Sequence, residues 1–271
     1  MASQRDHEHA HAIAMEAGQR LLRLRAEQLP DVTDAAAVNA FAKLADRTSD
    51  DWILARIREE FPDDAILSEE TEDDLARLGA DRCWIVDPVD GTWEYSHNRS
   101  DFAVHIALWE RGRGLTAGTV AVPANGEHWS TYERGTHAHR SALPTDRHLR
   151  VVVSRTRPLK DEDAFVRSLA AELAPLHVPG VTLVRVGSVG AKVGEVLAGR
   201  VDAYVSESGF YEWDGAAPAV VAAHAGLIVS QLDGSPHTYN NANVKMPGYV
   251  VAPSWLAQHL YRVLVARRAG N

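Results

Sequence analysis

The stretch Trp84–Tyr95 reads Trp-Ile-Val-Asp-Pro-Val-Asp-Gly-Thr-Trp-Glu-Tyr and joins an apolar segment to two carboxylates. Its first residues are typical of a buried strand, and Asp87 and Asp90 stand where that strand ends, just before Gly91 and Thr92. Carboxylate oxygens are ligands that Mg²⁺ prefers, and free main-chain N–H groups at such a turn bind phosphate. The stretch therefore predicts a site that holds a metal ion and a phosphate together.

Two further segments place acidic residues at the end of a strand or at the start of a helix. Ile66–Glu70 reads Ile-Leu-Ser-Glu-Glu, and Trp213–Ala217 reads Trp-Asp-Gly-Ala-Ala, with Asp214 before an Ala-rich helix. Each feature alone has a structural explanation, since Asp-Gly forms turns, a Glu-Glu pair is often solvated, and Asp214 can cap a helix. Their joint occurrence, without a basic residue adjoining the carboxylates, favours a multi-metal phosphatase site.

Length, charge and composition narrow the class of protein. With 271 residues, of which 45% are apolar, the chain can bury a core in one large or two closely packed domains. Its net charge of −9 argues against binding to a nucleic acid polymer, which needs a basic surface. The single cysteine, Cys83, excludes an intrachain disulfide. With no apolar run of membrane-spanning length and no signal-peptide pattern, we expect a cytoplasmic protein that does not bind membranes.

The pattern of apolar residues predicts two halves of different build. In residues 1–147 we expect two helices, His9–Gln28 and Thr48–Glu60, to cover a strand-rich region that includes a hairpin at Asn125-Gly126. The polar segment Arg134–Arg147 divides the halves. Residues 148–271 then alternate strands and helices, which is typical of an α/β unit. The predicted fold class is therefore α/β, with an α+β N-terminal domain that carries the metal site and an α/β C-terminal domain that binds substrate.

The three acidic segments resemble the sequence words of a known family. Asp87–Thr92 is similar to the Asp-Pro-x-Asp-Gly-Thr signature of the lithium-sensitive, Mg²⁺-dependent inositol monophosphatase superfamily, and the other two segments match its Glu-Glu and Trp-Asp-x-Ala-Ala words in order. The resemblance covers nearly the whole chain. It implies a layered αβαβα sugar-phosphatase sandwich, a phosphatase that uses two or three Mg²⁺ ions or Mn²⁺ in their place, and inhibition by lithium. It also allows a homodimer.

The same resemblance implies which residues hold the metals. Glu69, Asp87 and the carbonyl of Val89 would bind the first ion, and Asp87, Asp90 and Asp214 would bind the second. A third, weaker ion would rest on Glu69 largely through water. Such ions lower the pKa of a bound water and stabilise the leaving oxygen of a phosphate ester.

The resemblance also implies a pair that orients the attacking water. In the family, an Asp upstream of the Glu-Glu word pairs with the Thr of the signature, here Thr92. The matching position is Asp46, within Lys43–Arg47, although the local sequence agrees with the family only in part. An ordinary carboxylate at a helix start is the alternative explanation of Asp46.

Two departures from the inositol branch point to a different substrate. Trp93-Glu94-Tyr95 resembles the x-Glu-Phe that follows the signature in 3′-phosphoadenosine 5′-phosphate phosphatases of the CysQ type. Gly187–Lys192 resembles the Gly-Ser-x-x-Lys word of bisphosphate nucleotidases, with one extra residue. Lys192 one turn into a helix would add a cation for a second phosphate, unless it is an ordinary solvated lysine. Trp93, Tyr95 or Tyr211 could stack on adenine or could belong to the core.

We therefore expect an enzyme that removes the 3′-phosphate from 3′-phosphoadenosine 5′-phosphate, and from its 5′-phosphosulfate, in sulfate assimilation. The expected substrate-binding residues are Asp90, Gly91, Thr92, Gly187, Ser188, Lys192 and Glu207. The first alternative is a phosphatase for inositol 1-phosphate or fructose 1,6-bisphosphate. A non-catalytic metal-binding module is the second alternative, but the chain has no EF-hand pattern.

Overall fold

The structure is a computed structural model that describes residues 2–132, 142–207 and 209–269. The elements of the N-terminal half are the helices α1 (Gln4–Gln28), α2 (Ala35–Glu60) and α3 (Thr92–Ser96) and the strands β1 (Ala65–Ser68), β2 (Arg82–Asp90), β3 (Ala103–Glu110), β4 (Gly114–Val122) and β5 (Glu127–Ser130). The five strands form one sheet in the order β1-β2-β3-β4-β5. β1 is parallel to β2, and the other neighbours are antiparallel.

In its described residues, the C-terminal half contains a second sheet of five strands and four α-helices. Its strands, in the order β10-β12-β8-β6-β7, are β10 (Ile228–Ser230), β12 (Tyr249–Ala252), β8 (Ala203–Ser206), β6 (Leu149–Ser154) and β7 (Val181–Val186). The helices are α4 (Glu162–Leu173), α5 (Val189–Leu197), α6 (Glu212–His224) and α7 (Ser254–Ala269). Two short strands, β9 (Phe210–Tyr211) and β11 (Lys245–Met246), pair separately. β6 is parallel to β7 and β8, and β12 is antiparallel to both of its neighbours, so this sheet is mixed.

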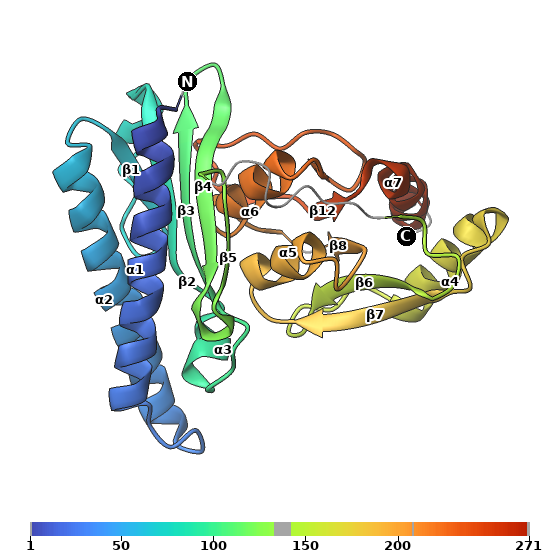
Figure 1. Cartoon of the computed structure of the whole chain (residues 1–271), viewed down its shortest axis with the longest axis horizontal. Helices are drawn as coiled ribbons and strands as arrows, with labels where there is room; N and C mark the ends of the chain where they lie inside the picture. Colours follow the sequence, from blue (N-terminus) through green and yellow to red (C-terminus); the bar gives the residue numbers. More distant parts are fainter. Residues whose placement is uncertain (1, 133–141, 208, 270–271) are drawn as a thin grey trace.

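Three apolar clusters hold these elements together as five layers (Figure 1). Along β2, Trp84 and Val86 pack under α1 and α2, whereas Cys83 and Ile85 face α5 and α6. Successive side chains of a strand point to opposite faces, so each sheet can separate two clusters. α4 and α7 cover the far face of the second sheet. The α/β class and the αβαβα layering that the sequence predicts are thereby confirmed.

Both N-terminal helices begin earlier than the sequence pattern predicts. α1 begins at Gln4 rather than His9, because Ser3 and Asp6 form a reciprocal capping box. α2 begins at Ala35 rather than Thr48, and its N-cap is Asp34, whose Oδ1 accepts from the amide of Ala36 at 3.1 Å. The predicted second helix was therefore too short by more than three turns.

Other local predictions agree with the structure. β4 and β5 form the expected hairpin, with Val122 paired to Glu127 and Gly126 at a φ of 68° in the turn. Cys83 is a free thiol in the core. None of the helices in the described residues has the length and apolar content of a membrane span. Residues 134–141, which are more than half of the predicted dividing segment, lie outside the described residues, so the domain boundary stays a prediction.

Candidate active site

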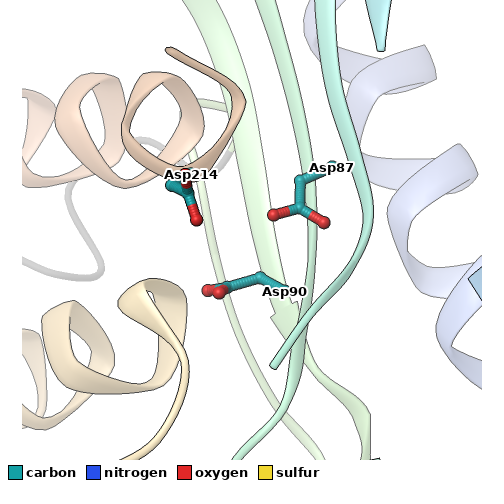
Figure 2. Close-up of side chains that lie close together, drawn as sticks. All are labelled: Asp87, Asp90 and Asp214. Atoms are coloured by element: carbon teal, nitrogen blue, oxygen red, sulfur yellow. The ribbon is translucent and has the colours of Figure 1, made fainter. Parts of the chain in front are cut away.

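Three carboxylates from two distant parts of the chain meet between the first sheet and the helices α5 and α6. Asp87 and Asp90 come from the end of β2, and Asp214 comes from the first turn of α6. Each offers an oxygen, and these three oxygens lie within 4.8 Å of one another. Figure 2 shows the three side chains converging on one space. Asp87 and Asp90 are 1% and 5% exposed, and Asp214 is partly buried, so the carboxylates themselves are largely shielded from solvent.

An irregularity in β2 allows both of its carboxylates to face this space. In a regular strand, residues three positions apart point to opposite faces of the sheet. Here the pairing with β3 shifts register between Asp87, which lies opposite His105, and Asp90, which lies opposite Ala103. Strand irregularities of this kind redirect side chains and are common beside active sites.

Glycines allow the strand end to approach α5 closely. Gly91 has a φ of 87°, which residues other than glycine rarely adopt, and an added Cβ would lie 3.1 Å from the Cβ of Ser188. A Cβ on Gly190 would lie 2.3 Å from Nε2 of His105. The amide of Gly190 donates to Oδ2 of Asp90 at 2.8 Å. The two halves of the chain are therefore in direct contact at this site.

The clustered carboxylates differ in their acidity. Burial, and then the negative charge of Glu69, raise the pKa of Asp87 well above its ordinary value. Loss of solvent in the pocket, followed by the charge of Asp214, raises the pKa of Glu69 to about 8, although part of this side chain remains open to solvent. Burial and the charge of Asp90 raise the pKa of Asp214 to about 6. These three carboxylates therefore cannot all be ionised together at low cost unless a cation binds among them.

Asp90 behaves differently from its neighbours. Burial opposes its ionisation, but His105, with Nε2 at 3.1 Å from Oδ2, and the Gly190 amide favour the charged form. The pKa of Asp90 is therefore lowered, and this carboxylate stays ionised. Sequence reasoning missed His105, because its position depends on the pairing of β2 with β3.

The predicted pair Asp46 and Thr92 is in contact. The Thr92 hydroxyl lies 3.2 Å from Oδ1 of Asp46 and 3.1 Å from the carbonyl oxygen of Val89. Burial, and then the charge of Glu70, raise the pKa of Asp46 to about 7. Asp46 lies in the middle of α2, whose N-cap is Asp34, so a capping role does not explain it.

α2 also fixes the segments that carry the acidic residues. The hydroxyl of Ser49 donates to the carbonyl of Pro88 at 3.1 Å, between the two aspartates of β2. Asp50 accepts from Ser68 at 2.5 Å and from Thr71 at 3.0 Å, on either side of the Glu-Glu pair. Ser49, Asp50 and Ser68 are buried, so these bonds hold the ends of β1 and β2 in place.

A pocket of about 330 Å³ opens at the carboxylates. Its lining residues are Glu69, Asp87, Val89, Asp90, Gly91, Thr92, Trp93, Glu94, Thr156, Arg157, Gly187, Ser188, Tyr211 and Asp214. All five predicted metal ligands and most predicted substrate-binding residues are among them. A larger pocket of about 530 Å³ lies elsewhere, between β4 and the segment 229–239, but it has no carboxylate in its lining. We therefore assign the chemistry to the acidic pocket.

Two predicted substrate-binding residues lie outside the pocket lining. Lys192 is 1% exposed, and its ammonium group donates to the carbonyls of Gly187 and Ser188, the latter at 2.8 Å. Glu207 accepts from the main-chain amide of Lys160 at 2.8 Å. The lysine is therefore not the solvated residue of the alternative explanation. In this arrangement it supports the turn before α5 instead of facing the pocket.

The aromatic candidates also separate. Tyr95 is completely buried and donates to the carbonyl of Leu21 at 2.9 Å, so it belongs to the core. Trp93 and Tyr211 are 47% and 39% exposed and line the pocket. Each is backed by a second ring, with centroid distances of 4.2 Å from Trp93 to His97 and 4.7 Å from Tyr211 to Trp213.

Glu94, the residue that distinguished the two family branches, connects the halves of the chain. Arg155, just after β6, donates to Glu94 at 2.9 Å and to Asp101 at 2.5 Å. Asp101 also accepts from the amide of Gly187 at 2.8 Å. Glu94 thus fixes the wall of the pocket through an ion pair that sequence reasoning did not foresee.

Comparison with known proteins agrees with this geometry. A model of the inositol monophosphatase family matches residues 3–266. The 3′-phosphoadenosine 5′-phosphate phosphatase of Mycobacterium leprae is 39% identical over 262 residues, which cover 93% of this chain and 90% of that protein. The inositol-1-monophosphatase of Bacillus subtilis is 30% identical over 231 residues, covering 83% of this chain and 84% of that protein.

A solved structure shares the fold. CysQ from Bacteroides thetaiotaomicron, described as a bacterial member of the inositol monophosphatase family, superposes with a TM-score of 0.73 at 28% identity. The superposition covers 92% of this chain and 97% of that one. The chain therefore belongs to the inositol monophosphatase family. It is a phosphatase, and the family to which it belongs is metal-dependent.

Proposed function

We propose that the chain is a Mg²⁺-dependent phosphatase that removes the 3′-phosphate from 3′-phosphoadenosine 5′-phosphate, and from its 5′-phosphosulfate. The observation that carries the substrate is the similarity to the phosphatase of Mycobacterium leprae over 93% of the chain. The convergence of Asp87, Asp90 and Asp214 supports the chemistry. In a cell that assimilates sulfate, the reaction removes a product that would otherwise accumulate.

The donor set fits a hard divalent cation. The cluster consists of carboxylate oxygens, and Oδ2 of Asp87 is buried without a hydrogen-bond partner within the described structure. Glu69, Asp87 and the Val89 carbonyl would hold one ion, and Asp87, Asp90 and Asp214 would hold another. Such ions supply an acidified water and charge stabilisation of the leaving oxygen.

Asp46 and Thr92 would orient the attacking water and accept its proton. Thr92 lies between Asp46 and the carbonyl of Val89. Its hydroxyl can therefore donate a hydrogen bond to one of these oxygens while its own oxygen accepts one from a water. An Asp46 whose pKa is about 7 can accept a proton near neutral pH. Gly91 and Ser188 would border the reacting phosphate, because both line the pocket.

The exposed rings supply a place for the nucleobase. Trp93 and Tyr211 line the pocket from different elements, and their backing rings limit their motion. Stacking of a base on such a ring contributes about 1–3 kcal/mol. Inositol phosphates have no base and would gain nothing from this contact.

A phosphate-release panel tests the proposal. We expect kcat/KM for adenosine 3′,5′-bisphosphate to exceed that for inositol 1-phosphate and fructose 1,6-bisphosphate, with turnover lost on chelation and restored by Mg²⁺. The similarity to the Bacillus subtilis enzyme makes inositol 1-phosphate the second candidate. A preference for inositol 1-phosphate would replace the nucleotidase proposal. We also expect millimolar Li⁺ to inhibit in the presence of Mg²⁺, which sugar or nucleotide preference does not affect.

A further inference from the structure

Arg157 is the one basic side chain among the described residues that line the acidic pocket. The lining otherwise carries five carboxylates: Glu69, Asp87, Asp90, Glu94 and Asp214. A cation in this position favours substrates that carry a further anionic group. Metal ions can neutralise the carboxylates of the cluster, whereas Arg157 provides a positive charge that belongs to the protein itself.

The guanidinium of Arg157 is available for a ligand. The side chain is exposed, and no hydrogen bond or ion pair to another side chain occupies it in the described structure. The other nearby cations are already used, since Arg155 binds Glu94 and Asp101, and Lys192 donates to two main-chain carbonyls. Arg157 therefore differs from both of its basic neighbours.

The backbone that carries Arg157 is fixed on both sides. Its amide donates to Oγ of Ser154 at 3.1 Å, at the end of β6. Arg155 is held by its two carboxylates, and Leu159 is 5% exposed in the core. Pro158 further restricts the main chain that leads away from Arg157. The segment thus presents an exposed side chain from a well-supported backbone.

We propose that Arg157 binds the phosphate group that is not hydrolysed, which in the proposed substrate is the 5′-phosphate. This inference rests on the proposed function in its choice of nucleotide, but it applies to any substrate with a second phosphate. Arginine suits the task because its planar group stays charged and binds phosphate through two parallel hydrogen bonds. The structure thereby assigns to Arg157 the role that the sequence pattern gave to Lys192.

Paired substrates test this assignment. Arg157→Gln should lower kcat/KM for adenosine 3′,5′-bisphosphate by about tenfold or more, because a charge-assisted contact to phosphate is lost. Turnover of 3′-AMP, which lacks the 5′-phosphate, should change by less than about twofold, because this substrate cannot make the contact that the variant loses. Lys160→Gln removes the same charge from an exposed residue outside the pocket lining and should affect neither substrate.

Product inhibition gives a second measurement. Adenosine 5′-phosphate, the product that keeps the 5′-phosphate, should inhibit the native enzyme competitively, and Arg157→Gln should raise its inhibition constant by about tenfold. Arg157→Lys should fall between the two, since it keeps the charge but loses the planar group. The proposal is overturned if Arg157→Gln lowers turnover of both substrates equally, or of neither.

The native enzyme separates this proposal from the proposed function. If it prefers fructose 1,6-bisphosphate, the nucleotide assignment fails. Arg157 is then judged on fructose 1,6-bisphosphate against fructose 1-phosphate, and the variant should still lose activity on the bisphosphate selectively. If it prefers inositol 1-phosphate and Arg157→Gln leaves the ratio of bisphosphate to monophosphate activity unchanged, both proposals fail.

Discussion

The two ends of β2 (Arg82–Asp90) lie beside carboxylates in opposite electrostatic settings. At its start, the guanidinium of Arg82 lies 2.6 Å from an oxygen of Asp6 and 2.9 Å from one of Asp64. Burial would raise the pKa of Asp6, but hydrogen bonds from Arg82 and Ser3 hold it below its ordinary value. At the other end, Asp87 faces further carboxylates, and burial together with the charge of Glu69 raises its pKa well above the ordinary value.

This difference distinguishes structural carboxylates from functional ones. The chain supplies its own cation for Asp6 and Asp64, so these groups stabilise the folded state without any ligand. Asp87 and Asp214 form no ion pair with an arginine in the described structure, and their raised pKa values mean that ionising them beside Asp90 disfavours the folded state until a cation binds. The balance of charge around a carboxylate therefore indicates its role better than its burial does.

The largest effect should follow from changing the uncompensated end of β2. We expect Asp87→Asn and Asp90→Asn each to lower Mg²⁺-dependent phosphate release by about a thousandfold or more, because metal-ion charge stabilisation is worth several kcal/mol. Both variants should remain folded by circular dichroism. Near-native turnover in either folded variant would show that its carboxylate does not hold an essential ion.

Asp46→Asn should have the next largest effect. General acid–base groups contribute about 10²–10⁴-fold, so we expect kcat to fall by about a hundredfold with KM little changed. Asp51→Asn is the matched control, because Asp51 is an exposed carboxylate on the same helix. Steady-state kinetics of both variants decide the matter. A similar, small loss in the two would reduce Asp46 to a contributor to the general charge of the region.

The acidic residues of the site could be predicted together from the sequence. Short local motifs show the carboxylates that follow a strand or begin a helix. The fold class was also predictable, because strand and helix patterns alternate through residues 148–271. Helix starts were harder to predict. The cap of α2 is a single aspartate, Asp34, and the Ala-rich residues after it show little of the amphipathic pattern on which prediction depends.

Side chains whose role depends on long-range pairing could not be predicted. His105 reaches Asp90 only because β3 pairs with β2 in this register. Arg155 reaches Glu94 only because the two halves pack together. The sequence also could not show that Lys192 is buried while Arg157 is exposed, because one lies on a helix covered on all sides and the other on a loop.

Changing the compensated end of β2 should affect stability rather than chemistry. Removing one partner of a buried ion pair costs about 3–5 kcal/mol, and the partial exposure of Arg82 reduces our expectation for Arg82→Gln to about 2–3 kcal/mol. Arg56→Gln, which breaks a surface pair with Glu59, should cost less than about 0.5 kcal/mol. Urea unfolding measures both. Loss of activity without loss of stability in Arg82→Gln would contradict the assignment of this end to the fold.

The smallest effect should be a pH-dependent stabilisation by Mg²⁺. In the metal-free protein, Asp214 with a pKa of about 6 and Glu69 with a pKa of about 8 keep protons that the unfolded chain releases near pH 4. Between about pH 4 and pH 8 the folded state therefore binds more protons than the unfolded state. Its stability should fall as the pH rises from about 4 to 8 and then level off. Asp6, whose pKa is lowered, contributes in the opposite direction, but only in more acidic solution.

Mg²⁺ requires the ionised carboxylates, so it competes with these protons and binds more strongly at high pH. At a fixed, non-saturating Mg²⁺ concentration, we expect the gain in unfolding free energy to be about 1 kcal/mol larger at pH 8 than at pH 5.5. Thermal or urea unfolding with and without the ion measures this gain. Asp87→Asn should lose most of it, whereas Asp51→Asn should keep it. An equal gain at both pH values would mean that Mg²⁺ binds away from the raised-pKa carboxylates, and the two ends of β2 would then differ in acidity without differing in their need for a cation.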